Sequence, residues 1–198
     1  MKTLVFLRHG ETDWNAQGRY QGQTDILLND AGRLQAKEAA RRWSHTEFDA
    51  AIVSPLARAH ETGRIMLGDR DLELETIDAI QETDGGAWEG LVFTDIAQRW
   101  PDQHAAFRLP GLDSGPVGGE TPRESGTRTA NSVIAALGDA DVLAVIAHGN
   151  TLRAAAHLLT GRDDEDYATV PRLENCRAHV LQSNTGAFGT FTLTQTSV

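Results

Sequence analysis

The sequence has few of the features that mark secreted, membrane-bound or nucleic-acid-binding proteins. It holds a single cysteine, Cys176, which excludes an intramolecular disulfide framework and favours a reducing compartment such as the cytoplasm. Its N-terminal apolar run is interrupted at Arg8, too early for a signal peptide or a membrane-spanning helix. Acidic residues outnumber basic ones, and the formal net charge of −10 argues against nucleic acid or an anionic membrane as the main partner.

The motifs of two common catalytic classes are also missing. No Gly-x-Ser-x-Gly segment occurs, which weighs against a serine hydrolase built on a nucleophile elbow. No His-x-x-x-His pair and no dense cluster of aspartate and histidine occurs, so we expect neither a metal site nor a bound cofactor.

The residues that are present have the composition of a soluble globular protein, with 40% hydrophobic and 23% charged side chains. A length of 198 residues suits a single domain over 1–198 with a substantial core. Apolar or alternating segments predict strands at 4–7, 50–53, 72–80, 142–147, 173–181 and 188–194, the last two forming a hairpin. Because helical patterns separate the earlier strands, we expect an α/β fold, a three-layer α/β/α sandwich with a mostly parallel central sheet.

Capping residues place the helices. Asn29 begins one helix, Pro55 is expected at the first helical position of the next, and Gly161 ends the helix that follows His148. Thr121 opens a capping box with Glu124, and that helix is predicted to run to Leu137. The segment at about 85–120 is expected to cross over the crevice of the sheet as an irregular excursion with one short helix around 94–100.

Two predicted strands are followed by a histidine and a glycine. Arg8, His9 and Gly10 follow the first strand, and His148 and Gly149 follow the most apolar strand. In open α/β sheets ligands bind at the carboxyl ends of the strands, so both histidines are expected at one edge, within reach of one ligand. The simpler interpretation of the first segment is a surface turn with an incidental basic pair.

Arg58 falls in the first turn of a predicted helix, where the helix N-terminus already favours anions. Taken alone it is better explained as a solvated arginine. Together with Arg8 and two facing imidazoles, it can hold a phosphoryl group through charge-assisted hydrogen bonds. Phosphoryl transfer mainly requires in-line positioning and neutralised oxygens, which arginines and a protonated histidine can supply without a metal.

The same residues belong to a longer pattern that resembles the histidine phosphatase superfamily, in its phosphoglycerate-mutase-like branch. The matching segments follow the family's order along nearly the whole chain: Leu7–Thr12 with Trp14 and Asn15, Arg19–Gly22 with Asp25 and Leu28, Ser54–Ala59, Glu82 ahead of Gly86–Gly90, Gly119 with Glu120, and His148–Asn150 followed by Arg153.

The resemblance implies a role for each matching residue. His9 would be the nucleophile that becomes phosphohistidine, and Glu82 the acid that protonates the leaving oxygen and then activates water, with Asp84 as the rival carboxylate. The remaining positions are implied to bind the phosphate or line the substrate site: Arg8, Arg58 and His148 for the phosphate, and Asn15, Gln21, Gly22 and Gly149 for the substrate.

The branch contains both phosphatases and mutases. Mutases carry a longer excursion with paired arginines, whereas residues 91–119 here hold only Arg99 and Arg108, so we expect a phosphatase acting on a small phosphomonoester. Against this, the segment Ala147–Asn150 resembles the corresponding segment of the mutases more closely, so a phosphoglycerate mutase is the alternative. A third interpretation is a non-catalytic domain that binds a phosphorylated ligand. The candidate pocket residues are Trp88, Phe107, Arg108 and Leu109. A homodimer is the candidate assembly.

Overall fold

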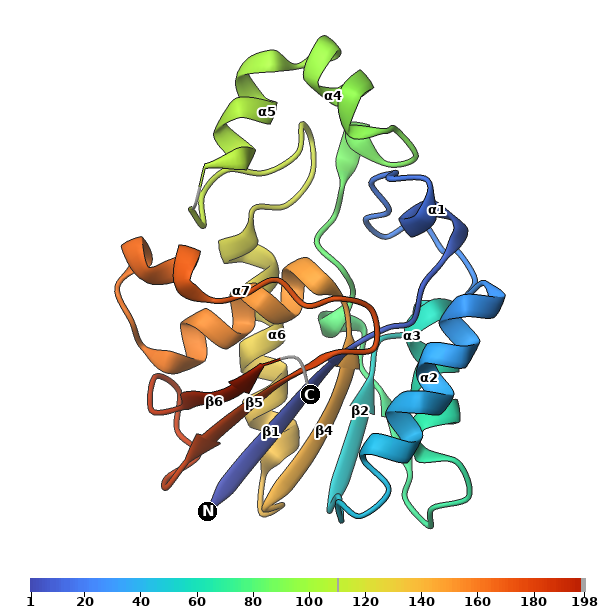
Figure 1. Cartoon of the computed structure of the whole chain (residues 1–198). Helices are drawn as coiled ribbons and strands as arrows, with labels where there is room; N and C mark the ends of the chain where they lie inside the picture. Colours follow the sequence, from blue (N-terminus) through green and yellow to red (C-terminus); the bar gives the residue numbers. More distant parts are fainter. Residues whose placement is uncertain (110, 197–198) are drawn as a thin grey trace.

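The computed structural model describes residues 1–109 and 111–196. Pro110, which begins the Pro/Gly-rich stretch of the predicted excursion, and the last two residues of the predicted domain lie outside this part of the chain. A six-stranded sheet forms the centre, and helices cover both of its faces (Figure 1). The predicted α/β/α fold with a mostly parallel sheet is confirmed.

The sheet has the strand order β3-β2-β4-β1-β5-β6. Its strands are β1 (Lys2–Arg8), β2 (Ala50–Val53), β3 (Leu74–Thr76), β4 (Val142–Ala147), β5 (Ala178–Ser183) and β6 (Thr192–Thr196). The pairs β3–β2, β2–β4 and β4–β1 are parallel, whereas β5 is antiparallel to both β1 and β6. The predicted closing hairpin is therefore present, and it occupies one edge of the sheet.

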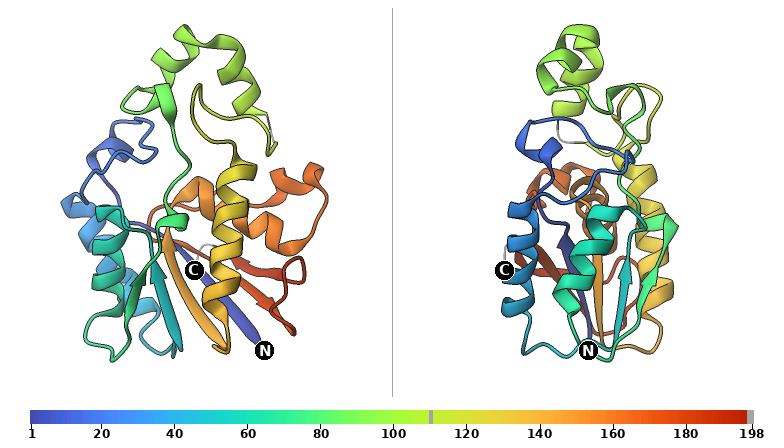
Figure 2. Two further views of the ribbon diagram at one scale, coloured as in Figure 1. Left: turned by 180° about the vertical axis from the view of Figure 1, so that it is seen from behind. Right: turned by 90° about the vertical axis from the view of Figure 1, so that its right-hand side faces the viewer.

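The helices fall into the two covering layers and an upper part. They are α1 (Asp13–Ala16), α2 (Asp30–Arg42), α3 (Ala57–Leu67), α4 (Phe93–Arg99), α5 (Pro101–Arg108), α6 (Pro122–Leu137) and α7 (Gly149–Thr160), with 3₁₀ helices at Asp78–Ile80, Gly86–Trp88 and Asp164–Thr169. Helices α2 and α3 lie on one face of the sheet, and α6 and α7 lie on the other (Figure 2). No helix in residues 1–109 or 111–196 is long and apolar enough to cross a membrane.

The central strand β1 shows why the sheet needs both layers. Its side chains alternate between the two faces: Leu4 and Phe6 pack with α6 and α7, whereas Val5 and Leu7 pack with α2 and α3. All four are buried. Burying one such side chain contributes about 1.5–3 kcal/mol, so a strand that is apolar on both faces is stable only between two helical layers.

Helix α6 begins as the capping residues predict. Thr121 accepts the N–H of Glu124, the Glu124 side chain accepts the N–H of Thr121, and the helix ends at Leu137. The expectation for Pro55 was wrong: Leu56 is the N-cap of α3, so Pro55 precedes the helix by two residues. Strand β3 is also shorter than predicted, because a 3₁₀ helix occupies residues 78–80.

Two helices, α4 and α5, lie over the carboxyl edge of the sheet, and we call them the cap (residues 93–108) (Figure 1). Helix α4 was predicted, but α5 was not; it begins with Pro101 at its first position. The cap packs on its own small core of Tyr20, Trp88 and Ile96, with Phe107 against it. Residues 85–120 thus cover the edge where both histidines are expected.

Candidate active site

The structure brings His9 and His148 together at the carboxyl edge of the sheet. They follow the adjacent parallel strands β1 and β4, where Arg8 pairs with Ala147, and the His9 N–H donates to the Ala147 carbonyl at 3.0 Å. Their ring centroids lie 5.2 Å apart at an interplanar angle of 57°. Both residues are buried.

A backbone hydrogen bond determines which nitrogen of the neutral His9 ring carries the proton. Nδ1 lies 2.6 Å from the carbonyl oxygen of Gly10. A carbonyl only accepts hydrogen bonds, so we assign the ring proton to Nδ1, which leaves the lone pair on Nε2. The Gly10 N–H donates to Thr62 Oγ1 at 3.0 Å, which holds this turn in place. His9 thus has the tautomer that a nucleophile requires.

The surroundings of both histidines favour their neutral forms. Burial, with the positive charges of Arg58 and Arg8, lowers the pKa of His9 well below its usual value. Burial and the charge of Arg58 do the same to the pKa of His148. Burial therefore favours a neutral His148 at pH 7, which differs from the protonated histidine expected from the sequence. A bound phosphate dianion would favour its protonated form.

The two predicted phosphate-binding arginines are anchored by backbone carbonyls. Arg58 donates from Nη1 to the Thr24 carbonyl at 2.8 Å and from Nη2 to the Gly22 carbonyl at 2.6 Å. Arg8 donates from Nη1 to the Leu173 carbonyl at 2.7 Å. Burial lowers the pKa of both guanidinium groups, and neither forms an ion pair within the described chain.

Three buried nitrogens at the carboxyl edge have no hydrogen-bond partner among the described residues: Arg8 Nε, Arg58 Nε and His148 Nδ1. Buried polar atoms without partners are rare in folded proteins and often belong to functional sites. An oxyanion beside His9 would supply acceptors for these groups.

Gly22 shows how closely the loops approach each other at this site. Its φ of +54° is in the left-handed region, and a Cβ at this position would clash with the Glu89 carboxylate and lie 2.8 Å from the backbone nitrogen of Gly85. Glu89 in turn accepts the N–H groups of Gln23 and Gly85 at 2.7 and 3.0 Å. A glycine is therefore required where the Gly22 carbonyl accepts from Arg58.

The carboxylate of Glu82 lies at the N-terminus of α7, the helix that begins directly after His148. Its Oε1 accepts the N–H groups of Thr151 and Thr83 at 3.0 and 2.9 Å, and its Oε2 accepts the N–H of Asn150 at 3.3 Å. Asp84 points elsewhere, since its carboxylate accepts the Gly86 N–H at 2.8 Å and it does not line the cavity beside His9. The geometry separates the two rival carboxylates.

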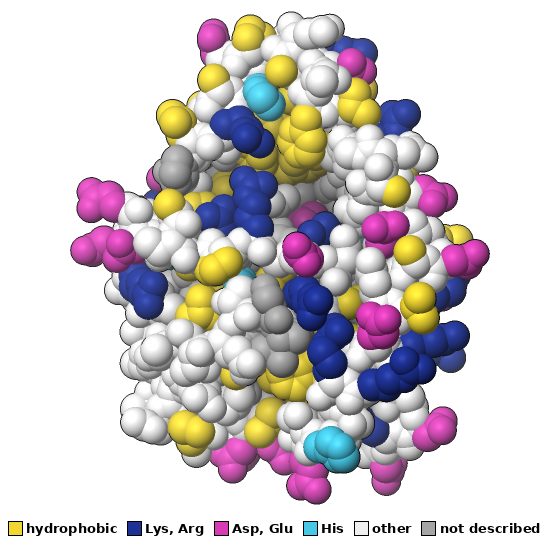
Figure 3. All heavy atoms as spheres, in the orientation of Figure 1, with side chains coloured by type: hydrophobic (Ala, Val, Ile, Leu, Met, Phe, Trp, Pro, Cys, Tyr) yellow, Lys and Arg dark blue, Asp and Glu magenta, His cyan; other side chains and the backbone are white. Residues whose placement is uncertain are grey.

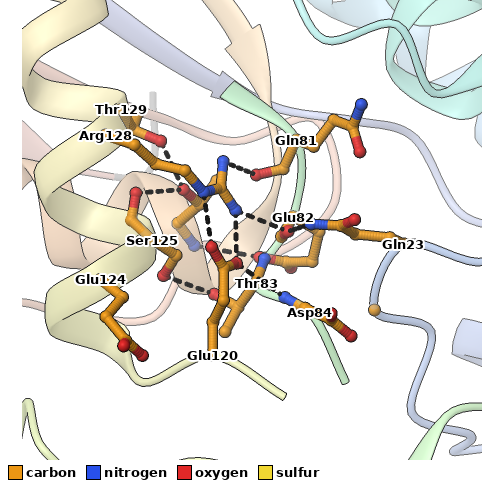
Figure 4. Close-up of polar contacts among 12 residues, drawn as sticks. Gln23, Gln81, Glu82, Thr83, Asp84, Glu120, Glu124, Ser125, Arg128 and Thr129 are labelled. Carbon is orange, nitrogen blue, oxygen red and sulfur yellow. Dashed lines mark hydrogen bonds and ion pairs between the residues drawn. The ribbon is translucent and has the colours of Figure 1, made fainter. Parts of the chain in front are cut away.

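The backbone of Glu82 is held by Arg128 of α6 (Figure 4). Arg128 donates to the carbonyls of Ala79, Gln81 and Glu82 at 2.7, 2.9 and 2.9 Å. It also forms a two-point ion pair with Glu120, at 2.9 and 2.7 Å, and Glu120 accepts the Asp84 N–H at 3.0 Å. The Arg128–Glu120 pair thus fixes the segment that carries Glu82.

A cavity of about 200 Å³ opens beside His9, under the cap. It is lined by eight of the nine predicted site residues: Arg8, His9, Asn15, Gln21, Gly22, Arg58, Glu82 and Gly149. The ninth, His148, is buried, and its ring centroid lies 5.2 Å from that of His9. Figure 3 shows the hollow between the cap and the body, with dark blue side chains beside it.

The candidate pocket residues from the sequence have different positions. Phe107 lines the cavity, whereas Arg108 and Leu109 line only a neighbouring hollow of about 150 Å³. Trp88 is fully buried and packs edge-on against Tyr20, so its role is structural. No group of three or more His, Cys, Asp or Glu side chains within residues 1–109 and 111–196 is arranged to hold a metal ion.

Comparison with models of protein families tests the family resemblance that the motifs indicate. Residues 4–195 match the model of the histidine phosphatase superfamily (branch 1). The chain belongs to this family.

Relatives within the family include both mutases and phosphatases. The chain is 32% identical over 182 residues to a 2,3-bisphosphoglycerate-dependent phosphoglycerate mutase of Beijerinckia indica, covering 87% of this chain and 86% of that protein. It superposes on a mycobacterial glucosyl-3-phosphoglycerate phosphatase in complex with VO3 with a TM-score of 0.89 at 26% identity, covering 98% and 97% of the two chains. A putative α-ribazole-5′-phosphate phosphatase from Escherichia coli superposes with a TM-score of 0.84 at 26% identity, covering 100% and 96%.

Two residues support this histidine phosphatase site although the sequence did not single them out as site residues. Asn175 donates from Nδ2 to the His9 carbonyl at 2.9 Å and to Asn15 Oδ1 at 3.3 Å. Ser54 Oγ lies 2.7 Å from His148 Nε2. Asn175 was expected within a strand, but β5 begins only at residue 178, and the preceding loop turns back toward the site. These supporting contacts depend on the folded geometry, although Ser54 belongs to a matching motif.

Proposed function

We propose that this histidine phosphatase family member is a phosphatase that hydrolyses a small phosphomonoester through a phosphohistidine at His9. The observation that carries the proposal is the state of His9: its Nδ1 is bonded to the Gly10 carbonyl, its pKa is lowered by burial, and the residue lines the cavity. Its neutral Nε2 has a lone pair for attack on phosphorus.

In the first step, His9 Nε2 attacks the phosphorus atom and the bond from phosphorus to the ester oxygen breaks. Arg8 and Arg58 neutralise the transferred oxygens, which is the main demand of phosphoryl transfer. Glu82 gives its proton to the departing oxygen. The Gly10 carbonyl stabilises the Nδ1 proton as the phosphorylated ring becomes positive.

In the second step, the Glu82 carboxylate removes a proton from water, and the water oxygen attacks phosphorus. The bond from phosphorus to Nε2 breaks, inorganic phosphate leaves, and His9 regains its lone pair. Glu82 thus ends protonated and ready for the next substrate, so protons balance over the cycle.

Two features support a phosphatase over a mutase. The two structural relatives described above are phosphatases by name, and the cap carries no paired arginines. The sequence relative named as a mutase makes a 2,3-bisphosphoglycerate-dependent mutase the second candidate. Cys176 is buried and forms no disulfide, which also suits our proposal that the protein acts in the cytoplasm.

Turnover on a panel of phosphomonoesters tests this proposal. Purified protein should release inorganic phosphate from at least one small phosphomonoester, and release should persist in EDTA because the arginines supply the positive charge. The same preparation should be assayed for conversion of 3- to 2-phosphoglycerate with and without 2,3-bisphosphoglycerate. Isomerisation faster than phosphate release would establish the mutase, and binding without turnover of any substrate would establish a phospho-ligand-binding domain.

A further inference from the structure

The cavity beside His9 carries more positive charge than one phosphoryl group needs. Its lining includes five arginines and a single carboxylate, although the chain as a whole has a net charge of −10. The arginines are Arg8, Arg19, Arg58, Arg153 and Arg172, and the carboxylate is Glu82. Arg8 and Arg58 suffice to bind the reacting phosphate. The excess of positive charge at the outer end of the cavity has no counterpart in the proposed reaction.

Arg153, on the second turn of α7, is held rigidly at this outer end. Its Nε donates to the Val170 carbonyl at 2.7 Å and its Nη2 to the Tyr167 carbonyl at 3.1 Å. The guanidinium carbon lies 4.3 Å from the centroid of the Tyr167 ring. Within the described residues, Nη1 has no hydrogen-bond partner and the side chain forms no ion pair.

Arg172 reaches the same place from the loop before β5. It is exposed, and in the described part of the chain its side chain makes neither a hydrogen bond nor an ion pair. Its charge helps lower the pKa of Arg153, after the larger effect of burial, so two like charges lie near each other. The next residue, Leu173, accepts from Arg8, which links this loop to the inner end of the cavity.

The two hollows under the cap meet at these arginines. Four residues line both the cavity beside His9 and the neighbouring hollow: Phe107, Asn150, Arg153 and Arg172. The junction therefore offers a planar guanidinium fixed on a helix, a second flexible one, an amide and an aromatic face. Arg19 is a weaker candidate, because its guanidinium donates to the Gly90 carbonyl at 2.6 Å and to Gln17 at 2.8 Å.

We infer that Arg153 and Arg172 form a second anion-binding subsite, which selects phosphomonoesters that carry another oxyanion on the leaving-group side. This inference rests on the proposed function. A carboxylate and a second phosphate share the required chemistry, since each presents oxygens to a guanidinium in a two-point geometry. The subsite binds the remainder of the substrate, whereas Arg8 and Arg58 bind the group that is transferred.

Matched substrates test the subsite by turnover. The carboxylate arm compares 3-phosphoglycerate with glycerol 3-phosphate and phosphoserine with phosphoethanolamine; the phosphate arm compares fructose 1,6-bisphosphate with fructose 6-phosphate. Arg172→Gln should lower kcat/KM about tenfold for the doubly anionic member of at least one arm, the size of one charge-assisted hydrogen bond. Its kcat/KM for the singly anionic members and p-nitrophenyl phosphate should stay within about twofold of wild type, since no contact to the transferred group is lost.

Two variants complete this comparison. Arg99→Gln removes an exposed arginine of the cap that lines neither hollow. In each substrate pair it should leave the ratio of kcat/KM, doubly over singly anionic member, unchanged. Arg153→Lys keeps the charge but loses the two-point geometry of the guanidinium. It should lower the same ratio of kcat/KM, doubly over singly anionic substrate, as Arg172→Gln does. Equal losses on singly and doubly anionic substrates, or no loss on either, would overturn the subsite.

A binding measurement separates this inference from the proposed function. In a His9→Ala background, titration calorimetry should show 3-phosphoglycerate or fructose 1,6-bisphosphate binding about tenfold more tightly than its singly anionic partner, and added Arg172→Gln should abolish the difference. A protein that turns over phosphomonoesters without this preference would retain the proposed function and lose the subsite. A preference in binding without turnover of any substrate by wild type would retain the subsite and refute the phosphatase.

Discussion

The carboxylate of Glu82 accepts the N–H of Thr151 at 3.0 Å, which ties the candidate general acid to the first turn of the helix that follows His148. The same helix carries Arg153 on its next turn. Groups proposed for the phosphate, the proton and the remainder of the substrate thus share α7 as a rigid support. A rigid support matters because a displacement of about 1 Å in such a site can cost on the order of 10²-fold in rate.

Glu82→Gln should show a strong dependence on the leaving group. An alkyl alcohol leaves poorly without a proton, whereas p-nitrophenolate leaves unaided, so alkyl phosphates should be slowed by roughly 10²–10⁴-fold and phosphorylation by p-nitrophenyl phosphate much less. Because the second step also needs this carboxylate, stopped-flow mixing with p-nitrophenyl phosphate should show a burst of nitrophenol.

Asp84→Asn is the matched control for this prediction. The Asp84 carboxylate accepts the Gly86 N–H and does not line the cavity, so its variant should show neither the burst nor the leaving-group dependence. The opposite pattern in the two variants would identify Asp84 as the acid.

Arg128 should act on catalysis only through the position of Glu82. Arg128→Lys keeps one charge but cannot donate at once to three carbonyls and Glu120, so alkyl phosphate turnover should fall by roughly 10–100-fold. The loss should be smaller for p-nitrophenyl phosphate in pre-steady-state phosphorylation. Equal losses for both leaving groups would show that Arg128 supports the fold without positioning the acid.

His9 and His148 should stay neutral below the pH at which ordinary histidines become charged. Burial lowers the pKa of each, so neither ring takes up a proton as the pH falls through 6.5. Long-range ¹⁵N–¹H NMR spectra of the free protein in phosphate-free buffer should show neutral rings at pH 6, and His9 protonated on Nδ1. A midpoint near 6.5 for His9 would contradict the burial of its charge.

The sequence predicts the sheet well because its strong signals are local. Leu4–Leu7 and Val142–Ala147 are apolar on both faces, and only a strand between two helical layers can bury them. The capping box at Thr121 depends on residues three positions apart, so it is visible in the sequence. The prediction for Pro55 was wrong although it used the same kind of local signal. Proline is favoured at the first helical position, but it also occurs just before a helix, as it does here.

The rest of the site depends on contacts between distant segments. Arg128 donates to carbonyls within residues 79–82, Glu120 accepts the Asp84 N–H, and Asn175 donates to the His9 carbonyl across 166 positions. None of these contacts leaves a spacing that can be detected in one sequence. The proposal of Glu82 over Asp84 as the general acid likewise rests on the direction of each carboxylate, because the two residues are only two positions apart in the chain.

Detection of the covalent intermediate tests the phosphohistidine most directly. Wild-type protein mixed with ³²P-labelled substrate and quenched within milliseconds should carry label that is labile to acid and stable to base, and peptide mapping should locate it at His9. His9→Ala should carry no label and should lose turnover. Undiminished turnover in His9→Ala, or wild-type label on another residue, would contradict the assignment of His9 as the nucleophile.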